Sequence, residues 1–503
     1  MFQKTYGGGF GDWAHSIQRT MDDGFIIAGG TNSFTLSWYH DLYLIKIDSD
    51  GNLVWSKSYG GDDGNETGYS VLHTNDGGFI VVGETSNFGQ GGADIYLIRT
   101  NSTGDTLWTR TFGGTHNDSG KSIQQTSDGG FILTGHTGGG VAGTDYDVYL
   151  IKLDADGSII WTKTYGGTGD DYGESVQQTI DGGYIIAGYG TSYGAGNWDF
   201  YLIKTDDDGN ITWSKTYGGP NADYGYKVQQ TSDQGYIITG TTGGFSANNW
   251  DVYLIKTDTD GNVSWSKTYG GPHPDGGNSV QQTIDGGFVI AGETWGNVFL
   301  IKTTSFGDTL WTKTYGGTDY DSGSSIILTA DGGFVIIGTI QSPPINFYGN
   351  VYLIKTDSNG NSGCYENYTN SLVSDASTIV TSPTMQTSSG GTSGNTTSNI
   401  VDGGSETILC TSVGIKDIHS NARELELYPN PFASYTTLHT DRFLKNVTLR
   451  IYNFFGQKIL EKANISGESI IIQRQNLLSG IYYLQIVEDD KSLPLKKLIV
   501  KDF

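Results

Sequence analysis

Several features of common folds and enzymes are missing from this sequence. No segment has the apolar spacing of an amphipathic helix, which argues against a helical architecture. No run of about 20 apolar residues is present, so we expect no transmembrane segment. The patterns HExxH and CxxC are absent, which removes the motifs of zinc proteases and dithiol enzymes. Met1-Phe2-Gln3 starts in mid-strand without a signal-peptide pattern, so we expect a mature or truncated chain.

Basic residues are also scarce. The chain has 29 Lys and Arg against 54 Asp and Glu, and its formal net charge is −25. A field of this sign repels nucleic acid and anionic membranes and favours cations, so we expect no nucleic-acid partner. Most N-terminal basic residues recur in YLIK-type and WxK-type segments, and this regular placement indicates ion pairing inside the fold.

Glycine is abundant, with 76 residues, and it marks a repeat. A Tyr-Gly-Gly or Phe-Gly-Gly tripeptide opens each period, and the spacings are 53, 53, 53, 52, 52 and 46 residues. The seven starts are Tyr6, Tyr59, Phe112, Tyr165, Tyr217, Tyr269 and Tyr315. A period of about 50 residues that holds several short strands is typical of a β-propeller blade.

Each period contains four short β-rich segments separated by Gly- and Asp-rich turns. The fourth segment carries a Trp and is missing from the seventh period, but the N-terminal residues Phe2–Tyr6 match it. We therefore predict an all-β chain with a seven-bladed β-propeller over residues 1–361. Its blades are four-stranded, the last blade is closed by the N-terminal strand, and a small C-terminal β-sandwich follows.

The segment from Tyr201 to Trp213 resembles the repeats of bacterial quinoprotein-like propellers, in which an Asp…Gly…Trp spacing docks one blade on the next. The turn here is one residue shorter, and only the architecture is implied. Residues 1–360 are more similar to the uncharacterised repeat propellers of secreted Bacteroidetes proteins.

Residues 362–423 are rich in Ser, Thr and Gly, a composition that predicts a linker or a thin β appendage. The two cysteines of the chain, Cys364 and Cys410, bracket this segment. In an exported protein we expect a disulfide between them, and the alternative is two unpaired thiols.

Residues 424–503 contain alternating strand patterns and four short sequence motifs: YPNP, IYNxxGQ, LxSGIYYL and KLIV. This combination resembles the type A C-terminal sorting domain of the type IX secretion system. The resemblance implies a small β-sandwich that directs the protein across the outer membrane, to the cell surface or the medium, and is then usually cleaved. It also implies the secretion machinery as a partner. The motif residues that carry the resemblance are Tyr428, Pro429, Asn430, Pro431, Gly456 and Gly480.

One acidic residue stands just before the first strand of every blade, and we predict a ring of seven at the channel mouth. With hard oxygen ligands, such a ring could bind a cation, with Ca²⁺ as the candidate cofactor and the metal otherwise unknown. The alternative is that each carboxylate stabilises its own turn by accepting backbone N–H bonds. The ring consists of Asp12, Glu66, Asp118, Asp171, Asp223, Asp275 and Asp321.

The loops between the second and third strands vary in length and carry many aromatic residues. Aromatic faces beside Asp and Asn are suited to stacking on sugars, although such rings can also pack on neighbouring loops. The predicted ligand-binding residues are Trp38, Tyr39, Tyr146, Tyr193, Trp198, Trp250, Trp295 and Tyr348.

From these patterns we predict an exported, non-catalytic propeller that binds a glycan or protein partner through its variable loops. One alternative is a glycosidase-like carbohydrate-active enzyme that uses acids at the channel mouth. A second alternative is a purely adhesive or structural surface protein. The near-identical blades show no distinctive acid pair, which favours binding over catalysis.

Overall fold

The structure is a computed structural model that comprises two compact units, Met1–Ser412 and Val413–Phe503, which are described separately. It describes the chain except for residues 36–38, 140–144, 246–248, 342–347, 364–365, 369–371, 377, 382–384, 389–391, 397–398, 403–404, 412–424, 429–432, 454–457, 475–476, 478, 489–490, 493–495 and 502–503. All regular elements of the described residues are β-strands. No helix capable of crossing a membrane is found in that part of the chain.

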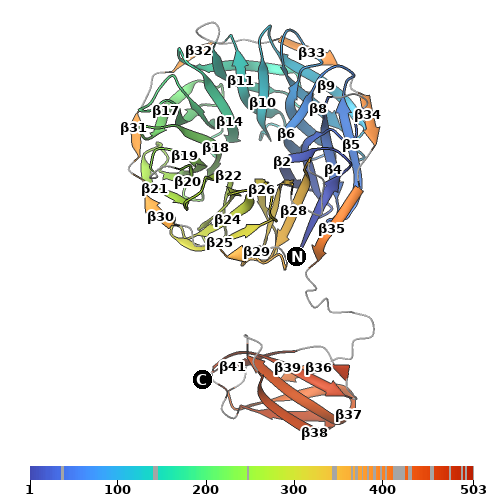
Figure 1. The fold of residues 1–503 in the computed structure, drawn as a ribbon. Coiled ribbons are helices and arrows are strands. Elements are labelled where there is room, and N and C mark those ends of the chain that lie inside the picture. Colours follow the sequence, from blue (N-terminus) through green and yellow to red (C-terminus); the bar gives the residue numbers. More distant parts are fainter. Residues whose placement is uncertain are drawn as a thin grey trace. The chain divides into compact units, whose positions relative to one another are not determined.

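Seven antiparallel sheets form a ring, and each contains four blade strands ordered from the channel outwards, which are consecutive in the chain in six of the sheets (Figure 1). Blades 1 to 3 are β2 (Asp12–Arg19), β3 (Phe25–Thr31), β4 (Asp41–Ile47) and β5 (Leu53–Gly60); β6 (Glu66–His73), β7 (Phe79–Thr85), β8 (Asp94–Thr100) and β9 (Thr106–Gly113); and β10 (Asp118–Gln125), β11 (Phe131–Gly138), β12 (Tyr146–Leu153) and β13 (Ile159–Gly166). Blades 4 and 5 are β14 (Asp171–Gln178), β15 (Tyr184–Gly190), β16 (Asp199–Thr205) and β17 (Ile211–Gly218), then β18 (Asp223–Gln230), β19 (Tyr236–Thr242), β20 (Asp251–Thr257) and β21 (Val263–Gly270). Blades 6 and 7 are β22 (Asp275–Gln282), β23 (Phe288–Thr294), β24 (Asn297–Thr303) and β25 (Thr309–Tyr315), then β26 (Asp321–Leu328), β27 (Phe334–Ile340), β28 (Asn350–Thr356) and the N-terminal β1 (Phe2–Gly7).

The last blade is closed as the sequence predicts, because β1 pairs antiparallel with β28, from Phe2↔Lys355 to Tyr6↔Val351. Elsewhere in the ring, a fourth-strand Tyr donates its hydroxyl to the turn glycine of the next blade, as Tyr217 does to Gly261 O (2.8 Å). Tyr6 makes the same bond to Gly51 O (2.6 Å), across the junction between blades 7 and 1. The seventh junction therefore has the same contact as five others, and the exception follows blade 2, where Phe112 stands in place of the Tyr.

Every inner strand contains a β-bulge between its third and fifth residues, for example between Gly173 and Ser175. The bulge presses the backbone of the inner strand against the glycine of the second strand. A Cβ at Gly188 would lie far inside van der Waals contact with the carbonyl oxygen of Tyr172. This close approach explains why the IIAG-type segment ends in glycine in all seven blades.

The Ser/Thr/Gly-rich segment contributes a fifth, outermost strand to every blade (Figure 1). The seven strands run backwards around the ring from blade 6 through blades 5 to 1 and end on β1 of blade 7. They are β29 (Glu366–Tyr368), β30 (Leu372–Asp375), β31 (Ile379–Thr381), β32 (Gln386–Ser388), β33 (Thr392–Thr396), β34 (Asn399–Asp402) and β35 (Ser405–Thr411). We call this set of strands the belt.

A short internal period matches the belt to the blades. The belt residues that pair with the aromatic of each Tyr-Gly-Gly or Phe-Gly-Gly are six or seven positions apart. They are Glu366, Val373, Val380, Thr387, Ser393, Ile400 and Glu406. Seven extended residues span about 23 Å, so each belt step advances the chain by one blade.

The C-terminal unit is rich in strands, as the sequence predicts, and its strands pair in one connected six-stranded sheet. Its strands are β36 (Leu425–Tyr428), β37 (Tyr435–Asn453), β38 (Lys458–Gln473), β39 (Gly480–Glu488), β40 (Lys491–Ser492) and β41 (Lys496–Val500). Irregularities between His439 and Leu449 interrupt the β37–β38 ladder. Leu438 before the interruption and Leu484 on β39 belong to one buried core.

Candidate functional site

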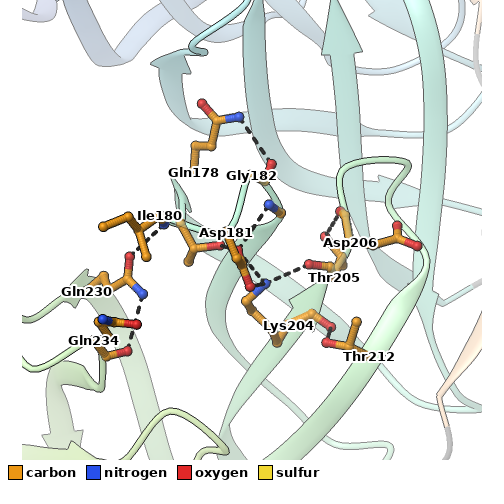
Figure 2. A network of polar contacts seen from close by, with 12 residues as sticks. Gln178, Ile180, Asp181, Gly182, Lys204, Thr205, Asp206, Thr212, Gln230 and Gln234 are labelled. Atoms are coloured by element: carbon orange, nitrogen blue, oxygen red, sulfur yellow. Dashed lines mark hydrogen bonds and ion pairs between the residues drawn. The ribbon is translucent and has the colours of Figure 1, made fainter.

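One face of the ring carries the uniform turns, and its charged groups are used within the fold (Figure 2). In blade 4, Lys204 Nζ lies 2.9 Å from Asp181 Oδ2, and Gln230 Oε1 of the next blade accepts the amide N–H of Ile180 (3.0 Å). Five further blades contain the same ion pair, which confirms the predicted internal pairing of the YLIK basic residues. These pairs are Lys46–Asp22, Arg99–Asp76, Lys152–Asp128, Lys256–Asp233 and Lys302–Asp285.

All seven carboxylates of the predicted acidic ring are buried at the start of the inner strands, rather than exposed at the channel mouth. Asp223 Oδ2 accepts the amide N–H of Gly219 (2.7 Å), and Asp171 Oδ2 accepts Ser192 Oγ–H (2.6 Å). This geometry matches the second interpretation, in which the carboxylate stabilises its turn. Among the described residues no group of three or more His, Cys, Asp or Glu is placed to hold a metal ion, so calcium at the ring stays an untested prediction.

The ring carboxylates have acidic neighbours. At five blade junctions, the Asp that opens the third strand and the ring carboxylate of the next blade flank the same glycine, as Asp199 and Asp223 flank Gly218. At the two junctions around blade 7, the third-strand position holds Asn297 or Asn350 instead. Burial, together with the neighbouring Glu66, raises the pKa of Asp41 to about 7. Burial, opposed by hydrogen bonds and reinforced by Asp147, likewise raises the pKa of Asp171 to about 7.

The seven blades differ most where their inner edges form the channel mouth, at the end of the variable loops. The second and fourth residues of the inner strand change from blade to blade, as does the sixth residue of the second strand, while their neighbours stay nearly constant. The inner-strand positions are Trp13, Thr67, Ser119, Tyr172, Tyr224, Gly276 and Ser322, and His15, Tyr69, Lys121, Glu174, Tyr226, Asn278 and Ser324. The second-strand positions are Gly30, Glu84, His136, Tyr189, Thr241, Glu293 and Thr339.

Blades 1 to 4 give one side of the mouth a charged and polar character. Glu84 accepts the hydroxyls of Tyr69 (2.9 Å) and Ser119 (2.7 Å), and Lys121 Nζ lies 3.5 Å from the centroid of the Tyr69 ring. Burial, assisted by Lys121, lowers the pKa of His136 to about 3, so this imidazole is neutral at physiological pH. Glu84 and His136 line a cleft of about 490 Å³.

An arc of five aromatic rings continues from this cleft along blades 3 to 5. The rings of Tyr146, Tyr172, Trp198, Tyr224 and Trp250 follow one another with centroid distances of 5.4, 5.8, 5.9 and 5.6 Å and interplanar angles of 31–37°. Each inner ring is therefore covered by neighbours on both sides. Trp250, at the end of the arc, is 37% exposed.

The arc ends at a cleft of about 650 Å³ between blades 5, 6 and 7, which we call the aromatic cleft. It brings together three residues predicted from the sequence, Trp250, Trp295 and Asp275. It also contains residues that sequence reasoning missed: Tyr224, Tyr226, Glu293, Asp319 and Tyr320. Variation between the repeats at otherwise constant positions is the signal that could have found several of them.

The aromatic cleft exists because blade 6 lacks a long loop. The shortest period, 46 residues, leaves only Trp295 and Gly296 between β23 and β24, and both have positive φ, 41° and 78°. A two-residue hairpin with two positive φ angles normally favours Asn-Gly, and a bulky residue there costs about 1–2 kcal/mol. Trp295 is nevertheless 66% exposed and lies 3.8 Å from the His273 ring, between centroids. Such strain at an exposed aromatic residue points to a functional role.

The other predicted aromatic residues lie apart from the aromatic cleft. Tyr193 packs against the core of blades 3 and 4 and donates its hydroxyl to Gly166 O (2.9 Å). Tyr39 and Tyr348 are exposed, and Tyr348 lies 6.0 Å from Phe10, between ring centroids. Trp38 lies outside the described residues.

In the C-terminal unit, Tyr428 ends β36 and is exposed, and Gly480 opens β39. Pro429, Asn430, Pro431 and Gly456 lie outside the described residues, as does Cys364 of the expected disulfide. Cys410 falls in β35 of the belt.

Residues 426–501 match the family described as the Secretion system C-terminal sorting domain. The chain thus carries a C-terminal sorting domain. This finding confirms the predicted resemblance and identifies an exported protein that is sorted by the type IX secretion system. The sorting domain also implies contact with the secretion machinery.

Weaker similarities cover different shares of the chain. A structure of PorZ, an essential bacterial surface component of the type-IX secretion system of Porphyromonas gingivalis, has a TM-score of 0.34 at 9% identity, over 99% of this chain and 85% of that chain. Drosophila Plexin A in complex with Semaphorin 1b has a TM-score of 0.40 at 8% identity, over 70% of this chain and 88% of that chain. Regulatory protein FlaEY of Caulobacter vibrioides is 29% identical over 202 residues, which are 35% of this chain and 21% of that protein. This chain therefore spans about a fifth of that relative, and similarity at these levels indicates no shared activity.

Proposed function

We propose that this exported protein binds a glycan in the aromatic cleft and does not transform it. The observation that carries the proposal is the pair of exposed indole rings, Trp250 and Trp295, in one cleft with acidic and hydroxyl groups. Aromatic faces stack on the C–H faces of sugars, and convergent polar groups fix their hydroxyls. The volume of about 650 Å³ falls within the usual range for small-ligand sites.

The polar groups of the aromatic cleft have suitable chemistry for sugar hydroxyls. Glu293 accepts the hydroxyl of Tyr320, so one carboxylate is held in a fixed orientation. Burial and the adjacent Glu293 raise the pKa of Tyr320, which keeps its hydroxyl protonated as a donor. Thr241 and Tyr226 add two further hydroxyls to the lining.

A glycosidase is the second candidate, and two acids in the aromatic cleft favour it specifically. Glu293 and Asp319 both line the cleft, and glycoside hydrolysis requires a pair of carboxyl groups. Against catalysis, Glu293 already accepts the Tyr320 hydroxyl, so one of the two acids is engaged within the fold.

A glycan array with and without Ca²⁺, followed by assays for product from each hit, tests the proposal. We expect binding that Trp295→Ala strongly weakens and that Tyr39→Ala, a change of an exposed aromatic residue outside the aromatic cleft, leaves unchanged. Product release that Glu293→Gln stops would replace the binding role with the glycosidase. An array without hits would favour a protein partner or an adhesive role.

A further inference from the structure

Two rings of side chains from the inner strands line the waist of the central channel. The upper ring, nearer the variable loops, is the fifth residue of each strand, and the lower ring is the seventh. The upper ring is serine in six blades: Ser16, Ser70, Ser122, Ser175, Ser279 and Ser325. The lower ring is glutamine in five: Gln18, Gln124, Gln177, Gln229 and Gln281. In blade 5 the upper ring carries Lys227, which lines a channel cavity of about 310 Å³.

Neighbouring blades occupy the acceptor atoms of the upper ring. The amide N–H of Val71 donates to Ser16 Oγ (3.3 Å), and that of Val176 donates to Ser122 Oγ (3.3 Å). Ser70, Ser175 and Ser279 accept in the same way. A hydroxyl that accepts a bond keeps its own proton, so these serines remain available as donors.

The lower ring follows the same rule. Gln124, Gln177 and Gln229 each accept a backbone N–H of the next blade at Oε1, at 2.5, 2.6 and 2.7 Å. Because a backbone N–H can only donate, the orientation of each amide is fixed, and its NH₂ group is left as a donor. The channel waist therefore presents hydrogen-bond donors in a protein whose net charge is −25.

Lys227 adds a positive charge to these donors. Burial alone lowers the pKa of its ammonium group, and no charged neighbour contributes. The nearby acid of the preceding blade, Glu174, has Lys121 as its basic neighbour instead. Within the described part of the chain, no carboxylate forms an ion pair with Lys227. Lys227 is half-buried, and a partly desolvated cation without a protein counterion is unfavourable unless an anion or water compensates it.

We propose that the channel waist binds a small oxyanion, in the form of a phosphate, sulfate or carboxylate group, at Lys227. An oxyanion has several acceptor oxygens, which suits donors that converge from different blades. The cavity of about 310 Å³ is large enough for such a group with its residual water. This site is distinct from the aromatic cleft and does not depend on glycan binding there.

Lys227→Ser provides a direct test because serine occupies this position in the six other blades, so the variant fits the ring. Isothermal titration with inorganic phosphate, sulfate and glucuronate would be run at constant ionic strength in chloride, with neutral glucose as a control. We expect the wild type to bind an oxyanion and Lys227→Ser to bind it at least about tenfold more weakly, since a charged hydrogen bond contributes about 1.5–3 kcal/mol. Lys227→Arg should retain binding, and Trp295→Ala should leave it unchanged.

The titrations also identify the source of the anion. Tighter binding of phosphate or sulfate indicates a free inorganic ion, whereas tighter binding of glucuronate indicates an acidic group of a larger ligand. The proposal is overturned if the wild type binds no oxyanion, or if Lys227→Ser binds as tightly as the wild type. If Lys227→Ser were unstable, equal binding by Lys227→Met and the wild type would overturn it as well.

Discussion

The two faces of the ring are built from the same repeated blades but use them differently. On the uniform face, the repeated basic residue and the repeated turn acid form the same ion pair in six blades. At the channel mouth, the same blades hold five or six different residue types at each of the three corresponding positions. The polar groups of the uniform face form contacts within the fold. At the channel mouth, several polar groups and aromatic rings line a cleft instead.

The comparison also separates two kinds of departure from the repeat. The loss of a loop in blade 6 opens a cleft and exposes Trp295. The exchange of serine for Lys227 in blade 5 places a charge in the channel without altering the strand. Each change alters one blade and leaves its four strands in place.

The largest expected effect comes from a scaffold glycine. In Gly188→Ala, the new methyl group would collide with the carbonyl of Tyr172, so we expect a loss of more than about 3 kcal/mol in unfolding free energy. Gly182→Ala is the matched control in the same blade: its Cβ meets no atom within 4 Å, and its positive φ of 89° costs only about 1 kcal/mol. Urea unfolding monitored by Trp fluorescence measures both. Equal losses would mean that the bulge does not set the close approach.

The second largest effect is expected at the channel mouth, where a substitution should change ligand binding rather than stability. Trp295→Ala should weaken glycan binding by about 30-fold, because a buried Trp contact is often worth 2 kcal/mol or more. Its unfolding free energy should stay nearly equal, because the Trp295 side chain is 66% exposed and alanine keeps the Cβ that strains the left-handed backbone. Titration of the best array hit and urea unfolding of the same preparation check the two parts together. Trp213 is a fourth-strand tryptophan that packs on the next blade, so Trp213→Ala should lower the unfolding free energy and leave glycan binding unchanged.

The ring could be predicted from the sequence because each of its determinants is local and repeated. Strand alternation, turn glycines and the displaced fourth strand at Phe2–Tyr6 can all be recognised when the repeats are aligned. The belt was harder to find, because its pairing partners lie up to about four hundred residues away and its composition resembles a linker. The six- or seven-residue period from Glu366 to Glu406 was the available signal.

The candidate site was predicted only in part. Aromatic content pointed to Trp250 and Trp295, but it also selected Tyr193, whose ring completes a core. The exposed aromatic residues differ from Tyr193 in their burial. Burial depends on how one loop packs against its neighbour, and residue spacing in the sequence does not reveal that packing. The burial of the ring carboxylates could not be predicted for the same reason. A carboxylate that stabilises its turn and a carboxylate that faces the channel would occupy the same position in the sequence.

The third prediction concerns pH and the paired carboxylates. The folded-state pKa of Asp41 is about 7, above its ordinary value near 4, so the folded state holds this proton more tightly than the unfolded chain does. The stability that follows is complete at about pH 4 and is lost as the pH rises through 7. Asp41→Asn copies the asparagine found at this position in blades 6 and 7, and it should raise stability at pH 8 by about 1–2 kcal/mol with little effect at pH 4. Urea midpoints across this range test the slope, and an unchanged slope in the variant would show that the pair does not share a proton.

The smallest effect belongs to the uniform face. Lys204→Met removes an ammonium group that is 7% exposed and its bonds to Asp181 and Thr205 O, while Asp181 remains 61% exposed and stays hydrated. Because water can solvate the acid left behind, we expect a loss of only about 1 kcal/mol and no change in glycan or oxyanion binding. If Lys204→Met weakened glycan or oxyanion binding, the separation between a scaffold face and a binding face would be wrong.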